Sequence, residues 1–173
     1  MSGKNMNETA MRYIASHRDE ILMALMEGLY EPYSPEAATS FRRKVDPFEN
    51  PIGSTFGRSA SIIADGMAAG MPPRAFRQTF DDMIRIRAVQ GISPSEVMSF
   101  LFAVRKALAA GTAGSGDDSL QASDIAEINE WIDCAIALCM DIYMECRENI
   151  FNLKVMELKK FGAAGREMRE KRI

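Results

Sequence analysis

The side chains that could do chemistry in this sequence are one histidine, three cysteines and a pair of nearby arginines. The histidine is His17, and the cysteines are Cys134, Cys139 and Cys146. For His17 to serve a haem or metal site it would have to be buried among supporting ligands, and the chain has no second histidine. The cysteines lack C-x-x-C spacing, and neighbours on one helix cannot easily reach disulfide geometry. We therefore predict no cofactor, no metal, a surface position for His17 and reduced thiols.

No catalytic motif accompanies these residues. The sequence contains no nucleophile elbow, P-loop, dinucleotide fingerprint or kinase motif. Cys139 and Cys146 fall on an apolar stripe, where a thiol behaves as a small hydrophobe; a redox-sensing thiol is the alternative. The sequence therefore predicts a protein that is not an enzyme and has no catalytic residues.

Arg87 is the charged residue that the pattern places closest to the core. It lies four residues after Met83 and three after Ile84, on the apolar stripe of its helix. A buried guanidinium needs a partner, and the last helix offers Asp141 and Glu145. We interpret Arg87 as one half of a structural polar pair with one of these acids, and ligand binding by Arg87 is the alternative.

The elements that must position these side chains are all helical. Apolar residues recur at three- and four-residue steps, and a period of two appears nowhere. The predicted all-α chain has about six helices, at 8–30, 35–44, 52–69, 73–90, 94–110 and 123–161. The best-specified corner lies between the fourth and fifth: Gly91 suits a helix C-terminus, and Ser93 with Glu96 forms a capping box.

Composition and termini predict a single cytoplasmic domain over residues 1–173. The chain is 47% hydrophobic, which is enough for a full core, and its net charge of −3 gives no bias towards nucleic acid. No apolar run approaches the ~20 residues of a membrane span, and no signal peptide is present, so we expect no membrane insertion. We expect disorder at 1–7, a flexible loop at 111–119 and a frayed basic tail at 162–173, with a docking arm as the alternative for the tail.

Thirteen methionines are an unusual number for 173 residues. Methionine fills irregular gaps, so a deformable core is the simplest interpretation. The alternative is a Met- and Phe-rich core that holds a small apolar ligand or cofactor.

The last predicted helix is too long for one small domain. At about 1.5 Å per residue it would run to roughly 55 Å, so part of it must project or pack on a partner. A second copy of the same helix covers its apolar surface by using one patch twice. We therefore predict a homodimer whose interface draws on Ile142, Cys146, Ile150, Phe151 and Leu153.

Three segments resemble the N-terminal domain of the RsbT co-antagonist family, RsbRD type. They are DPFENPIG (46–53), IRIRAVQGISPSEVMSF (84–100) and DIYMECRENIF (141–151), and the resemblance covers most of the chain from Ile21 to Leu158. It implies a globin-like helical domain without haem that forms dimers and receives signals. In stressosome proteins a phosphorylatable STAS domain follows, whereas this sequence ends at Ile173, so we expect a stand-alone domain.

Residues and resemblance together predict a non-enzymatic module of stress-response signal transduction. It would act through a helical homodimer and through contacts with a protein partner that the sequence does not identify. A protein that binds a small apolar ligand in its core is the alternative function.

Overall fold

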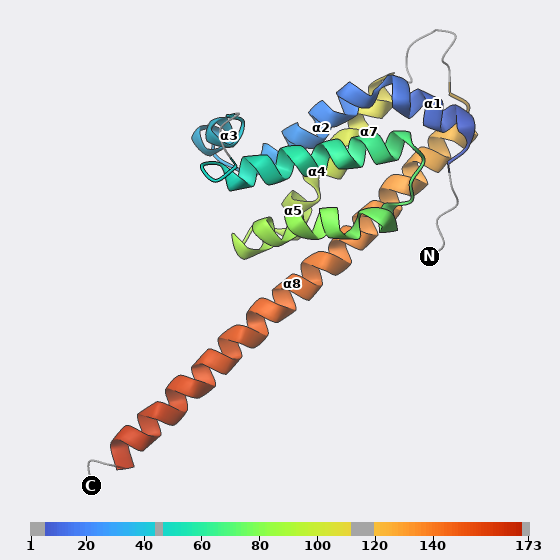
Figure 1. Ribbon diagram of the computed structural model, residues 1–173. Coiled ribbons are helices and arrows are strands. Elements are labelled where there is room, and N and C mark those ends of the chain that lie inside the picture. Colours follow the sequence, from blue (N-terminus) through green and yellow to red (C-terminus); the bar gives the residue numbers. More distant parts are fainter. Residues whose placement is uncertain (1–5, 44–46, 112–119, 171–173) are drawn as a thin grey trace.

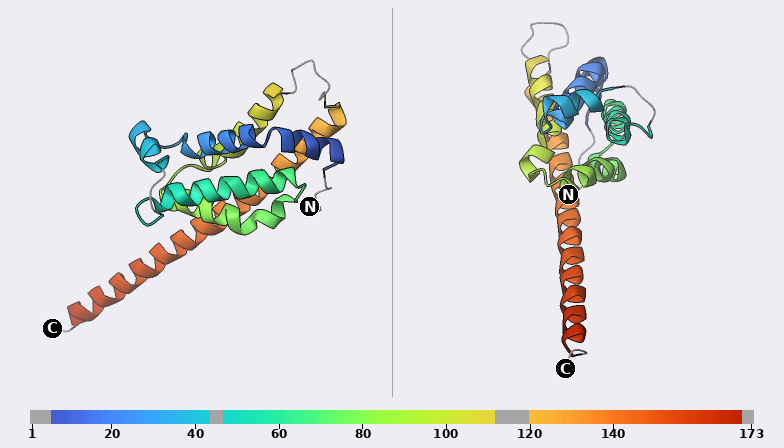
Figure 2. Two further views of the ribbon diagram at one scale, coloured as in Figure 1. Left: turned by 45° about the horizontal axis from the view of Figure 1, so that its top comes forward. Right: turned by 90° about the vertical axis from the view of Figure 1, so that its left-hand side faces the viewer.

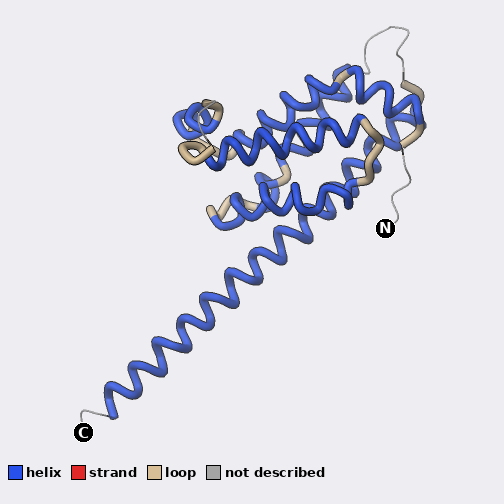
Figure 3. Tube along the Cα trace, viewed as in Figure 1, coloured by secondary structure: helices blue, strands red, loops and turns tan. Residues whose placement is uncertain are grey.

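The computed structural model describes residues 6–43, 47–111 and 120–170, and these residues form an all-α fold without strands (Figures 1 and 3). The prediction of an all-α bundle with a long last helix is confirmed. The elements are α1 (Glu8–Ser16), α2 (Arg18–Tyr30), α3 (Pro35–Phe41), α4 (Pro51–Ala68), a 3-10 helix η1 (Pro73–Phe76), α5 (Arg77–Val89), α6 (Pro94–Val97), α7 (Ser99–Gly111) and α8 (Ala122–Glu170).

Three of the six predicted helices are each divided in two. The first breaks at His17, between α1 and α2, where Ser16 Oγ donates to the Tyr13 carbonyl at 2.8 Å and His17 Nδ1 lies 2.9 Å from the same oxygen. Side chains that compete for a helix carbonyl in this way interrupt the backbone ladder. The fourth begins as η1 before α5, and the fifth breaks at Met98, between α6 and α7.

The helices α1 to α7 and the first half of α8 make up the body of the molecule (Figures 1 and 2). Within it α2 packs against α7 and α4, while α5 packs against α4 and α8. The crossing of α2 and α7 is close because Gly28 has no side chain: a Cβ there would lie 2.4 Å from the Phe100 Cα. The largest fully buried apolar side chains in this core include Phe56, Phe80 and Phe100.

The N-terminal residues that the structure describes are ordered against the start of α8. Met6 is 4% exposed and joins the core, and the Asn7 side chain caps α1. Asn7 also donates from Nδ2 to Asp124 Oδ1 and from its backbone N–H to Glu127 Oε2, both at 2.7 Å. The prediction of disorder is therefore wrong for Met6 and Asn7, and residues 1–5 lie outside the described residues.

Helix α8 contains 49 residues, so it is about 74 Å long and extends far beyond the body (Figure 2). The predicted end at Phe161 is wrong, because the backbone stays helical through Gly162 and Gly165 to Glu170. A glycine costs only about 1 kcal/mol in a helix interior, and a helix that is already formed gains a hydrogen bond with each added residue. Residues 171–173 and the loop at 112–119 lie outside the described residues.

Candidate functional site

The corner between α5 and α6 forms as the sequence predicts. Gly91 ends α5 with a φ of 78°, in the left-handed region that favours glycine. Ser93 Oγ accepts from the Glu96 backbone N–H at 3.4 Å, and the Ser93 backbone N–H donates to Glu96 Oε2 at 3.1 Å, which completes the capping box. Hydrogen bonds from Ser93 lower the pKa of Glu96 below its ordinary value. The corner directs α6 back towards the side chain of Arg87.

Arg87 is fully buried, with 0% of its surface exposed. Its Nη1 donates to the Val97 carbonyl and its Nη2 to the Glu96 carbonyl, both at 2.6 Å. The last carbonyls of a helix lack partners within that helix, so the guanidinium caps the C-terminus of α6. Nη2 also lies 3.3 Å from Ser99 Oγ, which donates to the Gly28 carbonyl at 2.6 Å. Arg87 therefore connects α5, which carries it, with α2, α6 and α7.

The charge of Arg87 is held by backbone dipoles. Burial lowers the pKa of Arg87 from its ordinary value to about 10, so the guanidinium stays protonated at neutral pH. Among the described residues no carboxylate lies within ion-pair distance of Arg87, and Nε has no hydrogen-bond partner there. Such a cation depends on the exact placement of its carbonyls, which makes the junction of α6 and α7 sensitive to changes around it.

The predicted acidic partners of Arg87 lie elsewhere. Both Glu145 carboxylate oxygens accept from Arg77 Nη2 at 2.8 Å, on the surface. Asp141 is exposed. Helix α8 turns Ile142 and Cys146 towards the body, and the residue before each lies about 100° around the helix, facing solvent. Arg87 has polar partners in the core, as the sequence predicts. The predicted pairing with Asp141 or Glu145 is wrong, because the partners are backbone carbonyls of α6.

The five predicted dimer residues fall into two groups. Ile142 and Cys146 are 1% and 4% exposed and belong to the core of the chain itself, so they are not available to a second copy. Ile150 is partly buried against that core, at the point where α8 leaves the body. Phe151 and Leu153 are 66% and 57% exposed on the projecting half.

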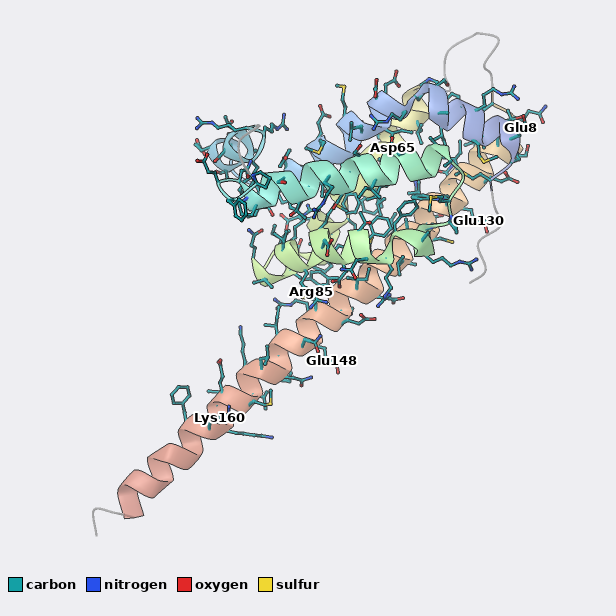
Figure 4. All side chains as sticks on the ribbon, in the orientation of Figure 1. Glu8, Asp65, Arg85, Glu130, Glu148 and Lys160 are labelled. Atoms are coloured by element: carbon teal, nitrogen blue, oxygen red, sulfur yellow. The ribbon has the colours of Figure 1, made fainter. Side chains whose placement is uncertain are left out.

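The projecting half of α8 carries more exposed apolar side chains than the sequence predicts. Beyond Phe151 and Leu153, it exposes Met156, Leu158 and Phe161 by 53%, 71% and 76%. Figure 4 shows that no other described element covers this half, where Glu148 and Lys160 are labelled. The signal that could have found these residues is the same three- and four-residue apolar step, followed for two more turns past Leu153.

Residues 19–154 match the family model of the RsbT co-antagonist protein rsbRD N-terminal domain. The chain belongs to this family. Searches of the curated proteins and of the solved structures find no match. The RsbRD N-terminal domain is a regulatory domain of the stressosome type and is not a catalytic family. The matched residues include the whole of α2 to α7 except Arg18, and they end within the projecting half of α8.

The histidine and the cysteines of this RsbRD N-terminal domain have no arrangement typical of a reactive site among the described residues. His17 is partly exposed at the surface, and its ring packs on Tyr13 with a centroid distance of 4.1 Å. The three cysteines are free thiols, and burial raises the pKa of Cys139, which disfavours the reactive thiolate. In the described parts of the chain no three His, Cys, Asp or Glu side chains group as a metal site would require. None of the described helices is long and apolar enough to cross a membrane.

Two hollows of the body bear on ligand binding. An open groove of about 700 Å³ runs between α2 and α7 and includes Gly28 and Ser99, the two residues that join the Arg87 network to α2 and α7. A narrower cavity of about 60 Å³ lies between α1, α7 and α8, where Leu108 and Ile132 are among its lining residues. The groove has Glu27 and Lys106 among its charged lining residues, which suits a polar contact better than an apolar ligand.

Proposed function

We propose that this domain is a non-enzymatic regulatory module that acts as a homodimer through α8. The observation that carries the proposal is the exposure of large apolar side chains on the projecting half of α8. Phe151, Leu158 and Phe161 are 66%, 71% and 76% exposed. Large apolar side chains gathered on one exposed helix mark an interaction surface. A second copy covers them most simply, because a two-fold contact uses one patch twice.

The path of α8 supports a regulatory role. Its first half is built into the core through residues such as Ile132 and Cys139, which are fully buried, and the same helix continues without a break to Glu170. A displacement of the body therefore moves the far end of a rigid rod. The Arg87 network adds a place where such a displacement can arise, since it joins α2, α6 and α7 to α5, and α5 packs on α8.

The alternative function, binding of a small apolar ligand in the core, has less support. The cavity beside Leu108 and Ile132 measures about 60 Å³. A cavity that takes up benzene measures about 150 Å³. The Met-rich composition is explained by the packed core itself, in which Met67, Met83 and Met98 are at most 1% exposed.

The test of the proposal is the oligomeric state. We expect the wild type to sediment as a dimer at tens of micromolar and Phe151→Asp to shift towards monomer. Met23→Asp is the matched control: Met23 lies on α2 and is 63% exposed, against 66% for Phe151, so it adds the same charge at similar exposure away from α8. A monomeric wild type, or a Phe151→Asp variant that dimerises as well as the control, would overturn the proposal.

A further inference from the structure

The open groove of about 700 Å³ between α2 and α7 has no lining residue on α8, so it is separate from the dimer surface proposed above. The less exposed residues of its lining are all small: Ala24, Gly28, Ser99, Ala103 and Ala107. The distance at which helices pack depends on the side chains between them. Because no long side chain fills the space between α2 and α7, a third helix can approach both of them closely.

The exposed residues of the lining add a large apolar side chain and charges of both signs. Phe102 of α7 is 47% exposed. Glu27 and Glu31, within and just after α2, are exposed on one side of the groove, and Lys106 of α7 is exposed on the other. None of these three charges forms an ion pair with the described part of the chain. An apolar surface bordered by charges that lack ion-pair partners is typical of a site that binds another protein.

The order of the charges along the groove follows from the opposite directions of α2 and α7. Gly28, near the end of α2, meets the first residues of α7. Tyr13, on the helix that precedes α2, donates to the Leu108 carbonyl near the end of α7 at 3.2 Å. Glu31 therefore lies at the end of the groove where α7 begins, and Lys106 lies towards the other end. Three residues of α2 and about six of α7 separate them from the crossing at Gly28, so they are roughly 14 Å apart along the groove.

We propose that this groove binds an amphipathic helix of a protein partner. The partner helix places small and apolar side chains on the groove and against Phe102, basic side chains opposite Glu27 and Glu31, and an acidic side chain opposite Lys106. A helix carries partial positive charge at its N-terminus and partial negative charge at its C-terminus, so the same order of charges favours an N-terminus beside Glu31. Helix α7 has 13 residues, and a partner helix of about that length covers the groove.

A helix in this groove contacts the network around Arg87. Gly28 and Ser99 line the groove, and Ser99 Oγ donates to the Gly28 carbonyl at 2.6 Å and lies 3.3 Å from Arg87 Nη2. Burial lowers the pKa of Arg87, and the negative charge of Glu31 is among the groups that oppose this shift. A basic side chain that pairs with Glu31 therefore weakens an attraction that stabilises the buried cation. Occupation of the groove acts on the junction of α6 and α7 in this way, and through α5 on α8.

A designed peptide tests the chemistry of the partner. The probe is a fluorescent helical peptide of about sixteen residues, long enough to form a helix, with alanine and leucine on one face. Arginines flank that face in its first half and glutamates in its second half. We expect saturable binding to the full chain, measured by fluorescence anisotropy, and binding at least about fivefold weaker for a peptide in which arginines and glutamates are exchanged. A scrambled peptide of the same composition, without a continuous apolar face, should also bind at least about fivefold more weakly. No saturable binding, or equal binding of the three peptides, would overturn the proposal.

Variants of the protein locate the binding site. Glu27→Arg combined with Glu31→Arg and Lys106→Glu should reverse the preference, so that the exchanged peptide binds more tightly than the original one. Ala103→Trp should abolish binding because the indole fills the groove, whereas Ala15→Trp, at an exposed position of α1 outside the groove, should bind as the wild type does. An unchanged preference in the charge variant would overturn the proposal even where Ala103→Trp does not fold.

Sedimentation of the protein without peptide separates this proposal from a contact between two copies. We expect Ala103→Trp and the charge variant to sediment as the wild type does. A change in their oligomeric state would show that a second copy occupies the groove, which overturns the partner helix. A monomeric wild type that binds the peptide would overturn the dimer through α8 and leave the groove proposal standing.

Discussion

Replacement of Arg87 tests whether a buried cation held by carbonyls organises the body. Three changes separate the contributions. Arg87→Ala removes the charge, its hydrogen bonds and most of the side-chain volume, whereas Arg87→Met removes the charge and keeps most of the volume. Arg85→Ala is the control, because Arg85 lies two residues away, is 55% exposed and forms its 2.9 Å ion pair with Asp81 on the surface.

The expected losses in the free energy of unfolding follow from the contacts. The two 2.6 Å hydrogen bonds of Arg87 contribute about 1.5–3 kcal/mol each, and the cavity left by alanine costs about 2–5 kcal/mol. Removal of the buried charge gives back roughly 3 kcal/mol of desolvation cost, since burial lowers the pKa of Arg87 to about 10. These contributions sum to a loss of roughly 2–8 kcal/mol, with a middle value near 5, for Arg87→Ala, and to roughly 0–3 kcal/mol for Arg87→Met, which retains the packing. For Arg85→Ala we expect a loss of under ~1 kcal/mol, because its ion pair is exposed to solvent.

Urea unfolding of the variants measures these differences. Equal, small losses for Arg87→Ala and Arg87→Met would refute the reasoning, because they would mean that the guanidinium is neither packed nor hydrogen-bonded. A double-mutant cycle then tests the partner: Arg87→Ala and Glu145→Ala should be additive within about 0.5 kcal/mol. A coupling energy of about 1 kcal/mol or more between the two substitutions would instead support the ion pair between Arg87 and Glu145 that the sequence suggested.

Three further predictions follow from local geometry. Gly28→Ala should lower the free energy of unfolding by at least ~1–3 kcal/mol through overpacking against α7, whereas Gly57→Ala, with open space around its Cβ, should raise it by up to about 1 kcal/mol; thermal melts compare the two. Ser93→Ala should cost about 1 kcal/mol at neutral pH. Hydrogen bonds from Ser93 lower the pKa of Glu96, so the stabilisation from this pair is present above the ordinary Glu96 pKa of 4.5 and is lost as the pH falls. Urea melts should therefore show a smaller difference in stability between Ser93→Ala and the wild type at pH 3 than at pH 5. Hemin added to the protein should give no absorbance change that His17→Ala removes, since the ring packs on its neighbour and has no second ligand; a His17-dependent spectrum would contradict this.

The sequence by itself determined the helical class, the corner after α5 and the presence of a polar group in the core. These features depend on neighbours in the chain: periodicity places Arg87 on the apolar stripe, and Gly91, Ser93 and Glu96 satisfy backbone groups within a few residues of themselves. The family followed from the same segments, because the helix-packing residues at 84–100 lie inside the matched range.

Only the tertiary structure decided which groups meet across the fold. Periodicity places Arg87 on the buried stripe of its helix but does not say which neighbouring helix that stripe contacts, so an acid on α8 was as reasonable as the carbonyls of α6. In the same way, apolar residues recur with the same spacing along the whole of α8. The body covers Ile142 and Cys146, whereas Phe151 and Leu158 are exposed. The physical reason is that burial depends on where the other helices end in space, and that is set by close approaches such as the one at Gly28, which connect residues far apart in the chain.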